Sequence, residues 1–180
     1  MKIGVIAGSF RQGSYSVMLA KAIMKELKTE CEVQFVEIKD LPHFNQDFES
    51  GETPQAVLDF RTVIQGCDGF VFVTPEYNRS YPGVLKNALD TASRPSGQDL
   101  WAHKPAAVVG VSPGRLAALA AVLAFRQPLS FLNVRLYSES ELCLGGFANA
   151  VDENGEIKDE TVKGLIVDFA ADFIAFSKKL

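Results

Sequence analysis

Short runs of β-branched and aromatic residues alternate along this chain with longer segments of helical periodicity. Three of the runs, at 2–8, 69–75 and 106–112, are apolar throughout, as expected when helices cover both faces of a parallel sheet. The alternation therefore predicts an α/β domain with a doubly wound parallel sheet. The expected strands are 2–8, 32–38, 69–75, 106–112 and 133–137, and the expected helices are 14–28, 54–65, 82–93, 115–131 and 159–178.

The chain of 180 residues is long enough for one domain with a substantial core, and it contains no linker, repeat or low-complexity stretch. We therefore expect residues 1–180 to form a single domain. Five strands of this kind most often order as 2-1-3-4-5 or 3-2-1-4-5, with ligands outside the carboxyl ends of the strands. The site should then lie on the loops after the first, third and fourth strands, which are "GSFRQGS" (8–14), "TPEYNRSYPG" (74–83) and "SPGRL" (112–116).

Charge and composition exclude several classes of protein. The net charge of -4 argues against a nucleic-acid-binding protein, which usually carries a basic face. The two histidines and three widely spaced cysteines offer little basis for a metal site, and the cysteines are expected to be reduced thiols. The longest apolar run, Leu116 to Phe125, is too short to span a bilayer. We therefore expect a soluble, cytoplasmic protein that binds neither nucleic acid nor membrane.

The first loop has the composition of an anion site. Gly8 and Gly13 let the backbone bend tightly, and the start of a helix offers free N–H groups. Serine hydroxyls and the guanidinium group of an arginine complete the set of hydrogen-bond donors. An alternative reading of the same residues is a serine helix cap with a surface arginine. The donors are Ser9, Arg11, Ser14 and Ser16.

The usual nucleotide motifs do not fit this first loop. The dinucleotide fingerprint requires glycine at the position of Phe10. The P-loop requires lysine where Ser14 stands and a hydroxyl residue that binds magnesium where Tyr15 stands. A single phosphomonoester is therefore the ligand that suits this loop best.

The fourth loop resembles a hydrolase motif but lacks its chemistry. "GVSPG" (110–114) matches G-x-S-x-G, which would make Ser112 a nucleophile. The oxyanion hole needs the N–H of the following residue, and Pro113 has none. Both histidines also precede the serine, in the wrong chain order for the triad. The loop is better explained as a binding loop, with donors from Ser112, Gly114 and Arg115, or as a plain turn before a helix.

The third loop is stiffened by Pro75 and Pro82 and presents Glu76, Tyr77 and Asn78 between them. An aromatic edge, an amide and backbone N–H groups suit a planar heteroaromatic ring with donors and acceptors on its rim. A ring joined to one phosphate, as in FMN, would occupy this loop and the first loop together.

The motifs together resemble a known family. "GSFRQGS", "TPEYNRSYPGVLKNALD" and "SPG", followed by "LGGFANAVDENGEI" (144–157), are similar to the NAD(P)H-dependent FMN reductases, in the branch of bacterial quinone and chromate reductases. The resemblance implies a flavodoxin-like three-layer sandwich of order 2-1-3-4-5. It implies FMN as cofactor and NADPH or NADH as donor, with hydride passing to flavin N5 and then two electrons to a quinone. Chromate, azo or nitro compounds are other acceptors that the family suggests.

The resemblance also implies roles for individual residues and names no general acid or base. Two departures from the family pattern are Ser16, where asparagine is frequent, and "RLAA" (115–118), where a glycine pair is frequent. The implied FMN contacts are Ser9, Arg11, Ser14 and Ser16 at the phosphate, Pro75, Glu76, Tyr77 and Asn78 along the ribityl chain and ring, and Ser112 and Gly114 at the polar edge of the ring.

Two rival functions share the same fold. A flavodoxin-like electron carrier would bind FMN without turning over nicotinamide, although its one-electron partners usually require a strongly acidic face. A flavin reductase would instead release FMN in reduced form. The net charge of -4 makes a weak case for the electron carrier, whereas the sequence does not separate the flavin reductase from an enzyme that keeps its FMN, nor NADH from NADPH.

Two apolar features suggest assembly. The segment 39–53 carries Phe44 and Phe48, and the helix 115–131 is apolar on most of its sides. We therefore expect a homodimer in which such elements cover the flavin. By resemblance, two dimers pair into a tetramer, with Arg126 and Glu141 at the contact between dimers. Two solvated surface charges are the alternative explanation for that pair.

Overall fold

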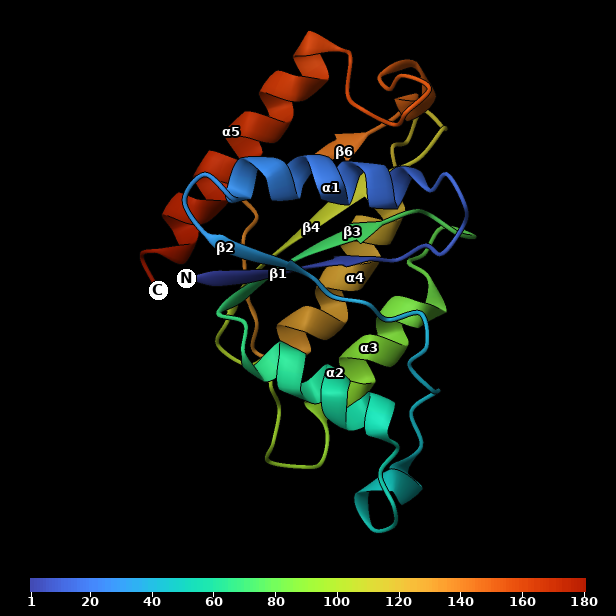
Figure 1. Cartoon of the computed structure of the whole chain (residues 1–180), viewed down its shortest axis with the longest axis vertical. Coiled ribbons are helices and arrows are strands. Elements are labelled where there is room, and N and C mark those ends of the chain that lie inside the picture. The colour runs from blue at the N-terminus through green and yellow to red at the C-terminus, as the bar shows by residue number, and fades with distance from the viewer.

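The computed structural model describes residues 1–180 and contains a parallel sheet with the strand order β2-β1-β3-β4-β5 (Figure 1). A short strand, β6, pairs with β4 beyond the end of β5. This order confirms the expected flavodoxin-like topology. The strands are β1 (Lys2–Ala7), β2 (Glu32–Phe35), β3 (Gly69–Thr74), β4 (Pro105–Val111), β5 (Arg135–Leu136) and β6 (Cys143–Leu144).

The helices cover both faces of the sheet. In Figure 1, α1 and α5 lie above it and α2 and α3 lie below it, with α4 packed on the same lower face. The helices are α1 (Tyr15–Leu27), α2 (Gln55–Gln65), α3 (Gly83–Ser93), α4 (Leu119–Phe131) and α5 (Glu160–Ser177), with short 3-10 helices η1 (Gln46–Glu49) and η2 (Phe147–Asn149).

Two hydrophobic cores fill the spaces between the layers. One lies between the sheet and α1 with α5, and contains Leu19, Ile23 and Phe173. The other lies between the sheet and the α2, α3 and α4 layer, and centres on Trp101 and Phe125. Strands β1, β3 and β4 supply side chains to both cores, which explains why their sequences are apolar throughout.

The structure corrects three expected boundaries and adds one strand. Helix α4 begins at Leu119 and not at 115, because Ala117 and Ala118 have φ values of 53° and 64°, which a right-handed helix cannot contain. The strands expected at 32–38 and 133–137 are shorter, at β2 and β5. The sheet has a sixth strand, β6, whose two residues were too few to produce a periodic pattern.

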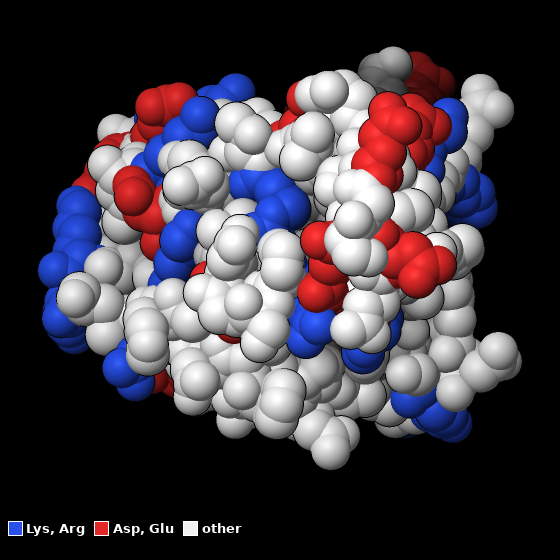
Figure 2. All heavy atoms as spheres, turned by 90° about the horizontal axis from the view of Figure 1, so that it is seen from below, with Lys and Arg blue, Asp and Glu red and all other residues white.

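Figure 2 views the molecule from below, on the side of α2 and α3, and shows basic and acidic side chains interspersed with uncharged surface. No single sign of charge covers this face. None of the helices is long and apolar enough to cross a membrane.

Candidate functional site

The loops after β1, β3 and β4 meet at the carboxyl edge of the sheet, on the right of Figure 1. Gly8 donates its N–H to the Val73 carbonyl at 2.9 Å. A Cβ atom at Gly8 would lie only 2.8 Å from a methyl group of Leu85 and 3.3 Å from Pro75 Cδ. Glycine is therefore required here for the first loop to approach the third.

The first loop buries three hydroxyl side chains around the start of α1. Ser9, Ser14 and Ser16 are 7%, 4% and 2% exposed. Ser14 is the N-cap, and its hydroxyl accepts the Val17 N–H at 3.4 Å. The Ser9 hydroxyl accepts the Arg11 N–H at 3.5 Å. The Ser16 hydroxyl makes no hydrogen bond within the chain and lies beside the helix N-terminus, where it is accessible to a ligand.

Arg11 folds back over its own loop. Its guanidinium donates to the Gly13 carbonyl at 2.8 Å and lies 5.3 Å from the centre of the Tyr15 ring. Gly13 has a φ of 67°, a conformation that glycine adopts without strain. Arg11, the residue expected to bind the phosphate, is thus exposed at the mouth of the loop, and its two contacts leave other N–H groups of the guanidinium free.

The third loop contains a tight reverse turn over residues 77–80. Tyr77 and Ser80 exchange both backbone hydrogen bonds, at 2.9 and 3.0 Å. The two central residues, Asn78 and Arg79, have φ values of 52° and 65°, as in a type I′ turn. Asparagine tolerates this conformation well, so the backbone explains Asn78 at least as directly as a ligand contact does. Tyr77 is 51% exposed and borders the site.

Glu76 links the third loop to α4. One carboxylate oxygen accepts the N–H groups of Ala120 and Ala121 at 3.1 and 3.4 Å. The other oxygen accepts from Arg79 at 3.5 Å. The side chain is 13% exposed, and its negative charge lies at the positive end of the helix dipole. These contacts favour a structural role for Glu76 over a role in proton transfer.

The fourth loop is a turn that leads into α4. Ser112 donates its N–H to Leu144 on β6, and its hydroxyl donates to the Gly114 carbonyl at 3.3 Å. Gly114 and Arg115 are exposed, and Arg115 has no ion-pair partner within the chain. The left-handed Ala117 and Ala118 then turn the chain into the helix.

The donor set fits a flavin mononucleotide. Buried serine hydroxyls, a free helix N-terminus and Arg11 suit one phosphate, because phosphate binds both dipoles and forked cations. The turn at residues 77–80 and the loop at Ser112 follow β3 and β4, the next two strands along the same edge of the sheet. The expected site residues therefore all lie on neighbouring loops of one sheet edge.

The features expected for assembly form contacts inside the chain. Arg126 and Glu141 make an ion pair of 2.5 Å. Phe44 and Phe48 line a cavity together with Val57 and Pro95 of the same chain.

Sequence reasoning missed two features of this edge. It did not anticipate the left-handed alanines before α4, or the bond from Ser112 to β6. The Gly145–Gly146 pair after β6 was the available signal, because a Cβ on Gly145 would lie 2.8 Å from the Gly114 carbonyl oxygen. The strand β6 thus supports the fourth loop from below.

Comparison with known proteins identifies the family. The family described as NADPH-dependent FMN reductase matches residues 1–149. A quinone reductase of Pseudomonas putida is 43% identical over 159 residues, which cover 88% of this chain and 86% of that protein. A 2-hydroxy-1,4-benzoquinone reductase of Burkholderia sp is 37% identical over 176 residues, 98% and 96% of the two chains.

A solved structure gives the same result. FerB, a flavoenzyme NAD(P)H:(acceptor) oxidoreductase of Paracoccus denitrificans, superimposes with a TM-score of 0.93 at 35% identity, and covers 99% of this chain and 97% of its own. The expected family, fold and class of enzyme are thereby confirmed. On this combined similarity of sequence and fold, the chain belongs to the NADPH-dependent FMN reductase family.

Proposed function

We propose that this protein is an FMN-dependent NAD(P)H oxidoreductase whose electron acceptor is a quinone. The observation that carries the proposal is the cluster of buried hydroxyls at Ser9, Ser14 and Ser16 around the N-terminus of α1. The Ser16 hydroxyl makes no hydrogen bond within the chain, so a bound anion can serve as its partner, beside the free N–H groups of the helix. The quinone follows from the names of the P. putida and Burkholderia relatives.

When bound, FMN supplies the redox chemistry, which moves two electrons from the nicotinamide to the acceptor. The residues of the chain bind and orient the reactants. The phosphate contacts come from the first loop, and Pro75, Glu76, Tyr77 and Asn78 border the ribityl chain and ring. Ser112 and Gly114 face the polar edge of the ring. Glu76 also fixes the third loop to the first turn of α4, which follows the fourth loop, through its hydrogen bonds to Ala120 and Ala121.

The proposed protein is a single domain of residues 1–180 that assembles as a homodimer in the cytoplasm. Helix α5 packs against α1 and the same sheet, which supports one domain. Helix α4 and the turn before it expose four large apolar side chains, which a second copy would cover. Charged contacts of Arg126 and Glu141 would then add a tetramer. The exposed residues are Leu116, Leu119, Leu123 and Phe131, which is 84% exposed.

Of the two rival functions, release of reduced FMN is the closer competitor, because the family takes its name from FMN reduction. A steady-state assay with a quinone separates the two. A holoprotein that keeps its FMN through gel filtration and reduces quinone without added flavin supports the proposal. An absolute requirement for free FMN in excess over protein would instead identify a flavin reductase.

A further inference from the structure

Strand β2 forms one edge of the sheet and pairs with β1 alone. The Val36 N–H donates to the Val5 carbonyl at 2.9 Å, so the even-numbered residues of this extended stretch bond toward β1. The N–H and C=O groups of Val33, Phe35 and Glu37 therefore point away from the sheet, and they make no hydrogen bond within the chain. In Figure 1, β2 lies at the front of the sheet and no helix crosses in front of it.

An uncovered edge of this kind can pair with an extended strand from another chain. Neither a proline nor a bulge interrupts β2, because its four residues, Glu32–Phe35, pair with β1 in continuous register. The backbone of this edge is therefore ready to accept a further strand, and the side chains around it decide which strand fits.

A cavity of about 290 Å³ lies between this edge and α2. Leu41 and Phe60 give it an apolar wall, and Asp40 and Asp59 add two exposed carboxylates. No lysine or arginine lines this α2-side cavity, and neither aspartate forms an ion pair within the chain. A long side chain with an apolar stem and a cationic head fits here, because its stem packs on the apolar wall while its head stays in water beside the carboxylates.

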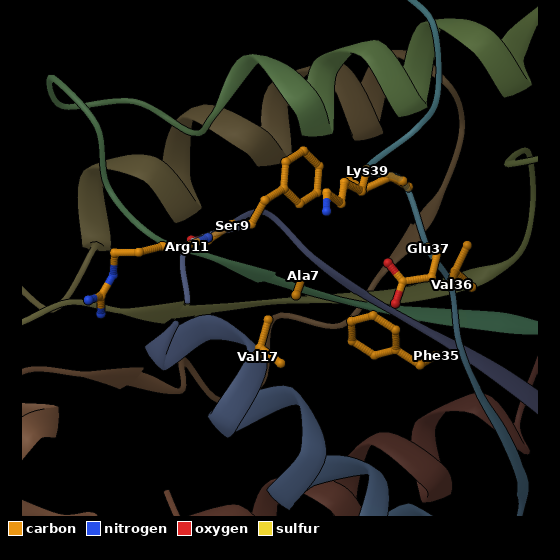
Figure 3. A pocket seen from close by; sticks show the side chains of 10 residues that line it. Ala7, Ser9, Arg11, Val17, Phe35, Val36, Glu37 and Lys39 are labelled. Atoms are coloured by element: carbon orange, nitrogen blue, oxygen red, sulfur yellow. The ribbon is translucent and has the colours of Figure 1, made fainter. Parts of the chain in front are cut away.

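The opposite face of the same stretch is mainly apolar. Figure 3 shows Phe35 and Val17 on this face, with Ala7 near them, around a smaller cavity of about 190 Å³. Val33 and Phe35 are half-buried against the core on the α1 side. Successive side chains of an added strand point to opposite faces of the sheet. Those on the α1 side should therefore be apolar, and those on the α2 side should be basic.

We propose that the β2 edge binds an extended segment of a partner protein in which apolar and basic residues alternate. The segment adds a strand to the sheet by pairing with the outward backbone groups of Val33, Phe35 and Glu37. A second copy of this chain is a poorer partner. Two β2 strands paired antiparallel would place their α2-side cavities next to each other on one face of the joined sheet, where the carboxylates of both copies repel.

Titration with synthetic peptides tests the proposal. The isotope-labelled protein, with FMN added, is titrated with a short, end-capped peptide of alternating lysine and valine, and separately with one of alternating glutamate and valine. At saturation the lysine peptide should slow hydrogen exchange of the Val33, Phe35 and Glu37 amides by about tenfold or more, because these N–H groups become hydrogen-bonded. Residue-resolved NMR measures the exchange. The glutamate peptide should bind more weakly.

Three variants test the residues themselves. Asp40→Asn and Asp59→Asn should each weaken binding of the lysine peptide about two- to fivefold, as expected for an exposed ion pair. Asp168→Asn is the matched control, because Asp168 is exposed on α5 and lies outside the α2-side cavity. Val33→Pro removes one outward N–H and leaves the groups that bond to β1, so it should weaken binding about two- to tenfold.

Any of four results would overturn the proposal. The lysine peptide does not bind at millimolar concentration, or it binds and protects amides elsewhere but not those of β2. The glutamate peptide binds as tightly as the lysine peptide, or Asp40→Asn and Asp59→Asn both bind the lysine peptide as tightly as Asp168→Asn does. Protection of the β2 amides that rises with protein concentration alone, without peptide, would instead identify a second copy as the occupant of this edge.

Discussion

Replacement of Glu76 by alanine should destabilise the protein through α4. The carboxylate is the only side chain that accepts N–H groups in the first turn of this helix, where Ala118 stands at the N-cap position and cannot accept any. Loss of such a cap costs about 1–2 kcal/mol, and loss of a negative charge at the positive end of the helix dipole adds about 0.5–1 kcal/mol. The free energy of unfolding should therefore fall by roughly 1.5–3 kcal/mol.

Thermal unfolding of the flavin-free protein, followed by circular dichroism, measures this change. For a chain of this size the expected loss corresponds to a fall in Tm of about 3–12 °C. Glu76→Gln keeps one acceptor oxygen and removes the charge, so its Tm should fall between those of the wild type and Glu76→Ala. Glu153→Ala is the control, because Glu153 is exposed and makes no side-chain contact within the chain.

Two outcomes would refute this reasoning. A Glu76→Ala variant with the Tm of the wild type would show that the carboxylate does not stabilise α4. A Glu76→Gln variant that kept its Tm but lost turnover would assign the carboxylate to chemistry and not to the helix.

Three further perturbations test other parts of the account. Arg11→Ala should weaken FMN binding about ten- to a hundredfold, from loss of a charge-assisted contact, and a titration with wild-type affinity would remove Arg11 from the phosphate site. Glycine at Ala117 or Ala118 should raise the free energy of unfolding in urea by about 0.5–1 kcal/mol, because both residues are left-handed; an unchanged midpoint would contradict that conformation. Arg126→Glu should shift any tetramer toward dimer in light scattering while FMN stays bound, and a wild type that is monomeric and fully active would refute the proposed assembly.

Local signals in the sequence predicted much of the fold. The apolar runs of β1, β3 and β4 identified central strands, because burial on both faces leaves no polar positions. Ser14 was recognisable as a possible helix cap from its side chain alone. The strand order needed the family resemblance, since the residues themselves allowed two orders.

The remaining features depend on contacts between distant residues. Glu76 meets Ala120 across 44 positions, and nothing local to either residue indicates that bond. Alanine favours helices, so the sequence "RLAA" predicted a helix where tertiary packing imposes two left-handed residues. The strand β6 forms because the N–H groups of Gly110 and Ser112 on the β4 side donate to the carbonyls of Leu142 and Leu144, and not because of its own sequence pattern.

The most direct test of the central claim is the visible absorption of the FMN-loaded protein, recorded without oxygen as reactants are added in turn. NADPH or NADH should abolish the absorption band of oxidised flavin, and a quinone added afterwards should restore it fully. With both substrates varied, double-reciprocal plots should then give parallel lines, because donor and acceptor use one site in turn. A protein that binds FMN and shows no change with either nicotinamide nucleotide would contradict the account and identify an electron carrier.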